Sequence, residues 1–295
     1  MSSDDVLVAQ RLRATSRGRR VRERALEACA WAALLVALIP LVAIAAFLMI
    51  QGVRALSLEF FISDPPGDLS ATGGGIRNAL VGTLMMTGLA TLIAVPVGIA
   101  LAVFSREIGG RVAATVRFII DVMAGLPSIV VGIFVYSLVV VATGHFSGYA
   151  GAVALAIIEL PVIVVATDEL LRLTDRRIDE GTRALGMTRW RSFAAVFIPT
   201  ALSGIMTGIL LAVSRAIGET APLIFTALGN NFFTLDMNEP VQAMPLLIYR
   251  NALNSAFPAA RDRAMGTALV LVVMVLAFNI LGRWIARRAR PADQR

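Results

Sequence analysis

Long apolar segments alternate with short polar segments along the whole chain. Six apolar runs are each about as long as the roughly 20-residue helix that crosses the hydrocarbon core of a bilayer. The runs are residues 31–50, 77–104, 118–142, 148–167, 199–228 and 264–285. Proline and glycine occur inside several of them, which membrane helices tolerate where neighbouring helices satisfy the freed backbone groups. The pattern predicts an all-α, polytopic integral membrane protein with six transmembrane helices.

Two of these runs contain residues that interrupt a straight helix. The third is broken by Gly125-Leu126-Pro127, and the fifth contains Gly218 and Pro222. Proline removes a backbone hydrogen bond and kinks a helix. We expect the fifth run to be one helix kinked at Pro222, where the kink is either an outer gate or a passive bend. A shorter apolar segment, residues 241–253, predicts a short helix lying at the outer surface.

The distribution of arginine predicts the orientation of the chain. The formal charge is +7, and all 27 basic residues are arginine. Of these, 21 lie in the N-terminal segment, in the loops 105–117 and 171–198 and in the C-terminal segment. Because cytoplasmic loops carry the excess of basic residues, both termini are expected in the cytoplasm. The predicted organisation is a basic tail (1–24), a membrane domain (25–288) and a second tail (289–295).

Composition excludes several classes of function. The chain is 57% hydrophobic with a mean hydropathy of +0.77, whereas soluble domains are about 45–50% apolar. It contains no lysine, so it has no ordinary Walker A site, whose lysine reaches the β- and γ-phosphates. With one cysteine (Cys29) and one histidine (His145), neither a metal site nor a catalytic nucleophile–base pair is expected. The arginines cluster at the ends of apolar runs, which indicates membrane topology and not nucleic-acid binding.

The polar loop before the fifth run has a distinctive sequence. Residues 180–199 read Glu-Gly-Thr-Arg-Ala-Leu-Gly-Met-Thr-Arg-Trp-Arg-Ser-Phe-Ala-Ala-Val-Phe-Ile-Pro. This loop, within 171–198, resembles the cytoplasmic coupling loop of ABC-importer permeases. The family pattern is Glu-Ala-Ala, three residues, Gly, nine residues and Ile-x-Leu-Pro. Gly186 stands at the family's glycine, and Gly181 and Thr182 replace its two alanines.

The resemblance implies that this loop docks on a separate ATPase. Gly186 is expected to allow a turn between two short helices, and Leu185, Trp190 and Phe193 are expected to fill a pocket of the partner. Pro199 fits the first turn of the next span, where its missing N–H costs nothing. The candidate coupling residues are Glu180, Gly181, Thr182, Leu185, Gly186 and Trp190. The alternative is an ordinary basic cytoplasmic loop.

Three further stretches make the resemblance more specific. They are residues 73–83 (Gly-Gly-Gly-Ile-Arg-Asn-Ala-Leu-Val-Gly-Thr), residues 120–132 (Ile-Asp-Val-Met-Ala-Gly-Leu-Pro-Ser-Ile-Val-Val-Gly) and residues 215–222 (Arg-Ala-Ile-Gly-Glu-Thr-Ala-Pro). Over roughly residues 70–285 the chain resembles the PstA-type permease family of the phosphate-specific transport (Pst) system. The resemblance implies a type I ABC-importer permease fold with its core at 76–285, in a bacterial plasma (inner) membrane.

Arg215 and Glu219 are the main candidates for substrate translocation. They are four residues apart, so in a continuous helix they share one face and can pair. An ionisable residue inside a span costs at least about 2.5–3.5 kcal/mol, so it faces a partner or a polar cavity. A guanidinium binds phosphate bidentately, and the resemblance implies that both residues act in phosphate passage. The alternative is a structural ion pair. Asp121 and Glu159 are secondary candidates, which could instead lie near helix ends.

The resemblance also implies partners. These are a second homologous permease subunit, an ATPase dimer that binds ATP and Mg, and an extracytoplasmic phosphate-binding protein. No catalysis and no bound cofactor are expected on this chain. Two alternatives stay open: an importer of another inorganic anion, such as sulfate or molybdate, and a secondary transporter that works alone.

Overall fold

The computed structural model describes residues 17–68, 70–173, 181–182 and 184–288. These residues form helices, turns and loops, with no strand among them, which confirms the all-α class. The chain forms two compact units, one ending at Ile50 and the other beginning at Gln51.

The described residues of the first unit form one long helix, α2 (Arg17–Gly52), whose last two residues are counted with the second unit. It begins upstream of the predicted run at Trp31 because its first turns are rich in Arg, Glu and Ala, which favour helix. Pro40 lies within it.

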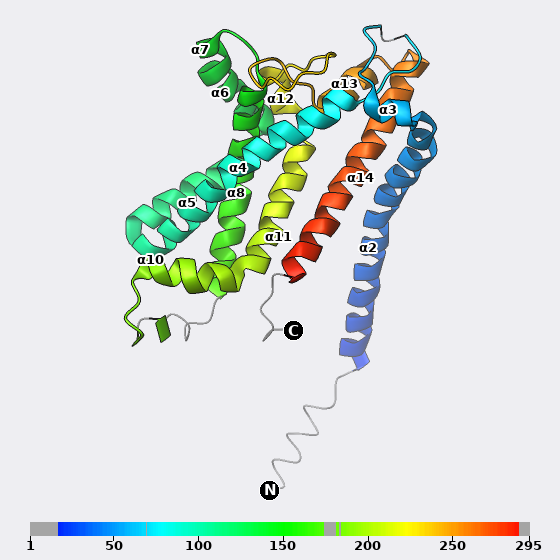
Figure 1. Ribbon diagram of the computed structural model, residues 1–295. Coiled ribbons are helices and arrows are strands. Elements are labelled where there is room, and N and C mark those ends of the chain that lie inside the picture. The colour runs from blue at the N-terminus through cyan, green and yellow to red at the C-terminus, as the bar shows by residue number, and fades with distance from the viewer. Residues whose placement is uncertain (1–16, 69, 174–180, 183, 289–295) are drawn as a thin grey trace. The chain divides into compact units, whose positions relative to one another are not determined.

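The second unit contains the remaining helices. They are η1 (Val53–Ala55), α3 (Leu58–Ile62), α4 (Arg77–Ile108), α5 (Gly110–Gly125), α6 (Ser128–Val135), the π-helical turn η2 (Tyr136–Val140), α7 (Val141–Thr143), α8 (Gly148–Leu173), α10 (Arg189–Ser192), the π-helical turn η3 (Phe193–Phe197), α11 (Ile198–Ile217), α12 (Ala221–Thr226), α13 (Met244–Leu253) and α14 (Pro258–Arg288). Within this unit α4 packs along α8, α8 against α11, and α11 against α14 (Figure 1).

Five helical segments of the described chain are long and apolar enough to cross a membrane. They are Val21–Ala55, Arg77–Ile108, Gly148–Arg172, Trp190–Ile217 and Pro258–Ile285. A sixth is formed if Gly110–Gly125 and Ser128–Thr143, which meet at 104°, are counted as one bent span. Each predicted run therefore has a helical counterpart, and the third is broken at the predicted Gly-Leu-Pro.

The fifth run is not one kinked helix. α11 ends at Ile217, residues 218–220 are non-helical, and α12 begins at Ala221. Pro222 lies in the first turn of α12, where its missing N–H leaves no bond unmade. The prediction of one continuous helix through Pro222 is therefore wrong, because the helix ends before Gly218 and a new helix begins at Ala221.

Small residues bring the central helices close together. A Cβ placed on Gly208 of α11 would lie 2.4 Å from the Cβ of Ala166 in α8. Helices in membranes associate largely by such close packing. Larger buried side chains, among them Met86, Leu155 and Leu223, fill the core between α4, α8 and α12. The helices α4, α8, α11 and α12 thus form a closely packed core next to the non-helical residues 218–220.

The segment predicted as a short surface helix forms α13, but much of it is buried. Met244 and Leu247 pack with Ile76 and Ala79 at the start of α4. The Met244 N–H also donates to Thr83 Oγ1 at 2.9 Å. The predicted short helix is therefore confirmed, but one side of it belongs to the protein core; its location at the outer surface of the membrane stays a prediction.

Candidate functional site

Arg215 and Glu219 lie on either side of the end of α11. Arg215 occupies the last turn of the helix, and Glu219 follows in the link to α12. Arg215 Nε and Glu219 Oε1 are 3.6 Å apart. The N–H groups of Gly218 and Glu219 donate, each at 3.1 Å, to carbonyls three residues back. The two side chains form the predicted ion pair, but a tight turn brings them together and not the face of one continuous helix.

Exposure distinguishes the two members of this pair. The side chain of Arg215 is 50% exposed and that of Glu219 is 16% exposed. A guanidinium has five N–H donors, and the contact with Glu219 uses its Nε edge. The Nη groups can therefore bind an oxyanion while Glu219 holds the side chain in place.

The surroundings of Arg215 include the bend of the third span. Arg215 lines a small pocket together with Leu126 and Ser128 at the α5–α6 bend and Pro161 of α8. The fold thus brings together residues 120–132 and 215–222, two of the stretches that carried the resemblance.

These two stretches also meet directly where α6 crosses α12. A Cβ added to Gly132 would lie 2.6 Å from Pro222 Cα, which is backbone and cannot rotate away. Glycine is therefore required at this crossing for the observed helix separation.

Gly132→Ala is expected to destabilise the protein by forcing α6 and α12 apart. Overpacking typically costs about 1–3 kcal/mol, which corresponds to a fall of several degrees in Tm. Gly88→Ala is the matched control, because a Cβ at Gly88 in α4 meets no described atom within 4 Å. Thermal unfolding of both variants in detergent checks the prediction; equal Tm values for the two would contradict it.

Glu159 lies in the middle of α8 and is fully buried. Thr91 Oγ1 of α4 donates to Glu159 Oε1 at 3.3 Å. The alternative that Glu159 lies near a helix end is therefore wrong. Its side chain is thus enclosed between α4 and α8, and its role in substrate translocation stays a prediction.

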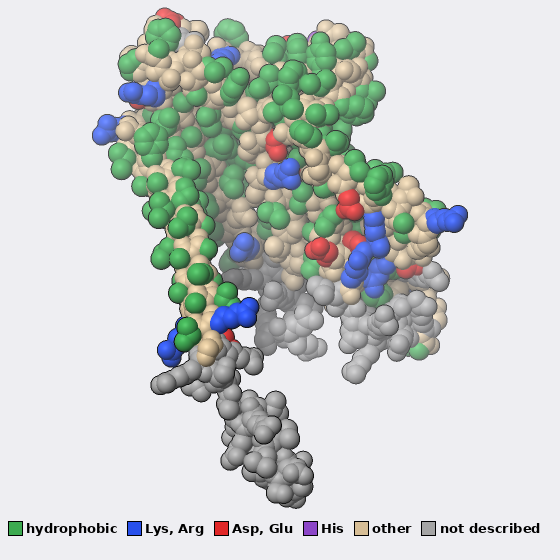
Figure 2. Space-filling view, turned by 180° about the vertical axis from the view of Figure 1, so that it is seen from behind, with side chains coloured by type: hydrophobic (Ala, Val, Ile, Leu, Met, Phe, Trp, Pro, Cys, Tyr) green, Lys and Arg blue, Asp and Glu red, His purple; other side chains and the backbone are tan. Residues whose placement is uncertain are grey.

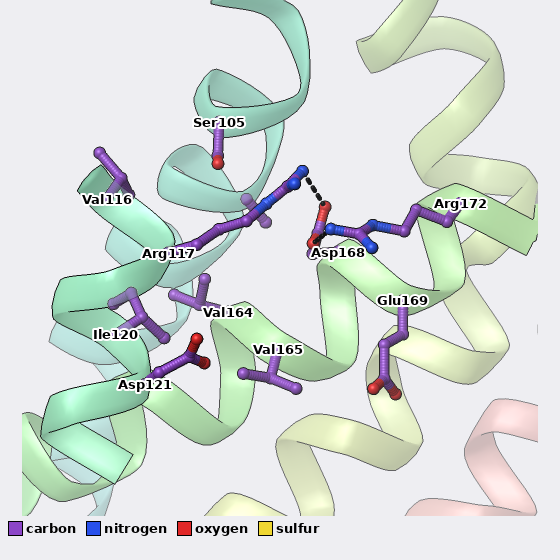
Figure 3. A pocket seen from close by; sticks show the side chains of 11 residues that line it. Ser105, Val116, Arg117, Ile120, Asp121, Val164, Val165, Asp168, Glu169 and Arg172 are labelled. Atoms are coloured by element: carbon purple, nitrogen blue, oxygen red, sulfur yellow. Dashed lines mark ion pairs between the residues drawn. The ribbon is translucent and has the colours of Figure 1, made fainter. Parts of the chain in front are cut away.

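Asp121 lies on α5, in its last two turns, and lines a different pocket from Arg215. This pocket, of about 200 Å3, lies between α4, α5 and α8 (Figure 3). Across it Asp168 Oδ1 is 3.5 Å from Arg117 Nη2, and Asp168 Oδ2 is 2.7 Å from Arg172 Nη2. The structure therefore places Asp121 beside a charged network and does not bring it to Arg215.

This network of Arg117, Asp168 and Arg172 was not predicted from the sequence. Asp168 and Arg172 are four residues apart on one helix, a spacing that predicts a pair. Arg117, however, comes from another helix, and no local pattern indicates that contact. In Figure 2, acidic and basic side chains gather close together low on the right of the larger body, below an area in which hydrophobic side chains are frequent.

Five of the six candidate coupling residues lie within residues 181–192, which are named the docking segment after their predicted role. Glu180, the sixth, and residue 183 lie outside the described residues. Residues 181, 182 and 184 are helical, and α10 begins at Arg189. Between them Gly186 has φ +69°, a left-handed conformation that glycine adopts without steric cost. The predicted turn between two short helices is therefore present.

Side-chain contacts hold the docking segment together. Thr182 and Ser192 are both buried, and Ser192 Oγ donates to Thr182 Oγ1 at 2.9 Å. Leu185 is 80% exposed and Trp190 63% exposed, so both are available to a partner. Phe193 is 4% exposed and packs with Phe197 in a core cluster. The prediction that Phe193 fills a partner's pocket is wrong, because its side chain is buried in the core of this protein.

Comparison with known proteins identifies the family. A model of the binding-protein-dependent transport system inner membrane component matches residues 94–292. This chain belongs to that family.

The permease is also similar to proteins named phosphate transport system permease protein PstA. It is 41% identical over 238 residues to that of Haemophilus influenzae, with 80% of this chain and 83% of the relative covered. It is 37% identical over 287 residues to that of Yersinia pestis, with 97% and 96% covered.

Solved structures show the same fold. An inward-facing structure of the MetNI methionine ABC transporter has a TM-score of 0.61 and 18% identity, covering 73% of this permease and 96% of that chain. A bacterial ABC transporter involved in import of the acidic polysaccharide alginate has a TM-score of 0.58 and 16% identity, covering 90% and 96%. The permease is thus a multi-pass membrane protein with the predicted type I ABC-importer permease fold.

Proposed function

We propose that this permease is the membrane subunit of an ATP-driven phosphate importer. The observation that carries the proposal is its 37% identity to the PstA of Yersinia pestis over nearly the full length of both chains. The named relatives favour phosphate over sulfate or molybdate. A docking segment with exposed Leu185 and Trp190 favours an ABC importer over a secondary transporter that works alone.

The proposed complex contains this permease paired with a second homologous permease subunit. An ATPase dimer, which binds ATP and Mg, docks on the cytoplasmic loops, and an extracytoplasmic phosphate-binding protein delivers phosphate. The absence of lysine from the sequence supports a separate ATPase. The arginine distribution supports cytoplasmic termini in a bacterial plasma membrane. The permease domain would comprise residues 25–288, and no cofactor would bind to this chain.

In this mechanism ATP binding closes the ATPase dimer and draws the docking segments together. The spans then turn from an inward-facing to an outward-facing arrangement, and ATP hydrolysis resets the complex. Phosphate passes the exposed side of Arg215, whose guanidinium neutralises part of its charge and donates hydrogen bonds to its oxygens. Glu219 orients that guanidinium and, by its negative charge, weakens retention of the anion so that phosphate is released.

Competition between anions tests the substrate assignment. Radiolabelled phosphate uptake is measured in vesicles that contain the complex purified through a tag on this permease, together with its binding protein. Excess unlabelled phosphate is expected to suppress the signal, and equal concentrations of sulfate or molybdate are expected to leave it unchanged. Equal suppression by sulfate would show that the importer does not select phosphate.

A further inference from the structure

Arg106, in the last turn of α4, contacts the end of α8. Its Nη1 donates to the carbonyl oxygen of Leu171, which lies in the last turn of α8. The last four carbonyls of a helix have no partner within that helix. A guanidinium satisfies such a carbonyl and interacts favourably with the negative end of the helix dipole. Arg106 therefore links the C-terminal ends of α4 and α8 by a hydrogen bond.

The same guanidinium also contacts the segment that joins the docking segment to α11. Its Cζ lies 5.8 Å from the ring centroid of Phe193 and 5.4 Å from that of Phe197. The two rings stack on each other with centroids 4.9 Å apart, and both are buried. A cation near aromatic faces is attracted by their electron density, and more strongly where water is excluded.

The two rings belong to the π-helical turn η3. This turn follows α10 directly and continues into α11, and the Ile198 N–H closes it by donating to Phe193 O. Val103 and Leu171 pack against the same rings. The contact is thus located between the docking segment on one side and the ends of α4 and α8 on the other.

We propose that Arg106 is a positioning residue that makes the docking segment move together with α4 and α8. A displacement imposed on residues 181–192 would reach both helices through Phe193 and Phe197. Since α8 packs against α11, it would also reach the helix that carries Arg215. Arginine suits this role because its planar guanidinium donates to a carbonyl while lying near the two rings, whereas the ammonium of lysine is a compact point charge. The inference rests on the proposed function.

Arg106→Gln tests the role in the complete complex. The variant is expected to retain its ATPase and to hydrolyse ATP at more than about half the wild-type rate, while phosphate imported per ATP hydrolysed falls at least about fivefold. Arg111→Gln is the matched control, because Arg111 lies nearby at the start of α5 and is exposed. Its ratio of import to hydrolysis is expected to match the wild type.

Phe193→Leu provides an independent variant that keeps an apolar side chain and removes one ring. It is expected to lower the ratio of import to hydrolysis in the same direction. The double variant with Arg106→Gln is expected to lower this ratio by less than the two single effects combined, because both substitutions remove the same contact between Arg106 and Phe193. Arg106→Lys is expected to give an intermediate ratio.

An unchanged ratio in Arg106→Gln would overturn the proposal. So would a parallel fall of hydrolysis and import, which would indicate an ordinary contribution to stability. Should Arg106→Gln fail to assemble, unchanged ratios in both Arg106→Lys and Phe193→Leu would overturn it. Failure of the proposed function is distinguishable, because the wild-type complex would then import no phosphate.

Discussion

Arg215→Gln is expected to lower the initial rate of phosphate uptake by about 10- to 100-fold while the complex stays assembled. Hydrogen bonds to a charged group contribute about 1.5–3 kcal/mol, and 1.4 kcal/mol corresponds to a factor of ten. Glutamine is polar and occupies similar space, but it has no positive charge for the anion. Uptake of radiolabelled phosphate by the reconstituted complex, at equal amounts of permease, measures the effect.

Two variants make this result interpretable. Arg261→Gln removes an exposed arginine near the start of α14 and is expected to leave uptake within about twofold of wild type, as is usual for surface substitutions. Arg215→Lys keeps the charge but loses the bidentate geometry, so partial uptake is expected. Normal uptake by Arg215→Gln would remove Arg215 from the phosphate path. Loss of assembly would instead favour a structural ion pair with Glu219.

Gly186→Val is expected to reduce co-purification of the ATPase to less than about a tenth of the wild-type amount. The φ of +69° at this position is costly for any L-residue with a side chain, by about 1–2 kcal/mol, and a β-branched residue is a genuine outlier there. The substitution therefore changes the turn and with it the presentation of Leu185 and Trp190. Affinity purification in mild detergent, followed by quantification of the ATPase subunit, measures the loss.

Gly181→Ala is the control for this prediction. Gly181 is helical, and a Cβ there meets no described atom within 4 Å. Alanine is about 0.5–1 kcal/mol more favourable than glycine in a helix, and it restores a residue of the family pattern. Co-purification is expected to equal or exceed that of the wild type. Unchanged binding of the ATPase to Gly186→Val would count against docking on this segment.

The features that were predicted correctly have local causes. Hydrophobic length alone indicated the spans, because each run must cross the same thickness of bilayer. The break at Gly125-Leu126-Pro127 and the turn at Gly186 follow from the backbone preferences of glycine and proline. Signals of this kind can be read within a few residues of sequence.

The features that were missed depend on packing between distant segments. A helix that is apolar all round gives no indication of which face is buried, so the burial of Glu159 could not be deduced. The burial of Phe193 depends on Val103 and Leu171, which come from other helices. The contact of Arg106 joins residues more than 60 positions apart. At Gly218 a local signal was present, since glycine weakens a helix and Pro222 suits a new first turn. Gly218 and Pro222 are equally compatible with a kinked continuous helix, so the sequence alone did not show that α11 ends before α12 begins.

Phosphate accumulation in proteoliposomes tests most directly whether this permease depends on ATP hydrolysed by a separate subunit. The isolated permease and the complete complex, each supplied with the loaded binding protein outside, are compared with and without ATP inside the vesicles. Accumulation of phosphate against its gradient is predicted only for the complete complex with ATP. Accumulation by the isolated permease without ATP would contradict the proposed mechanism.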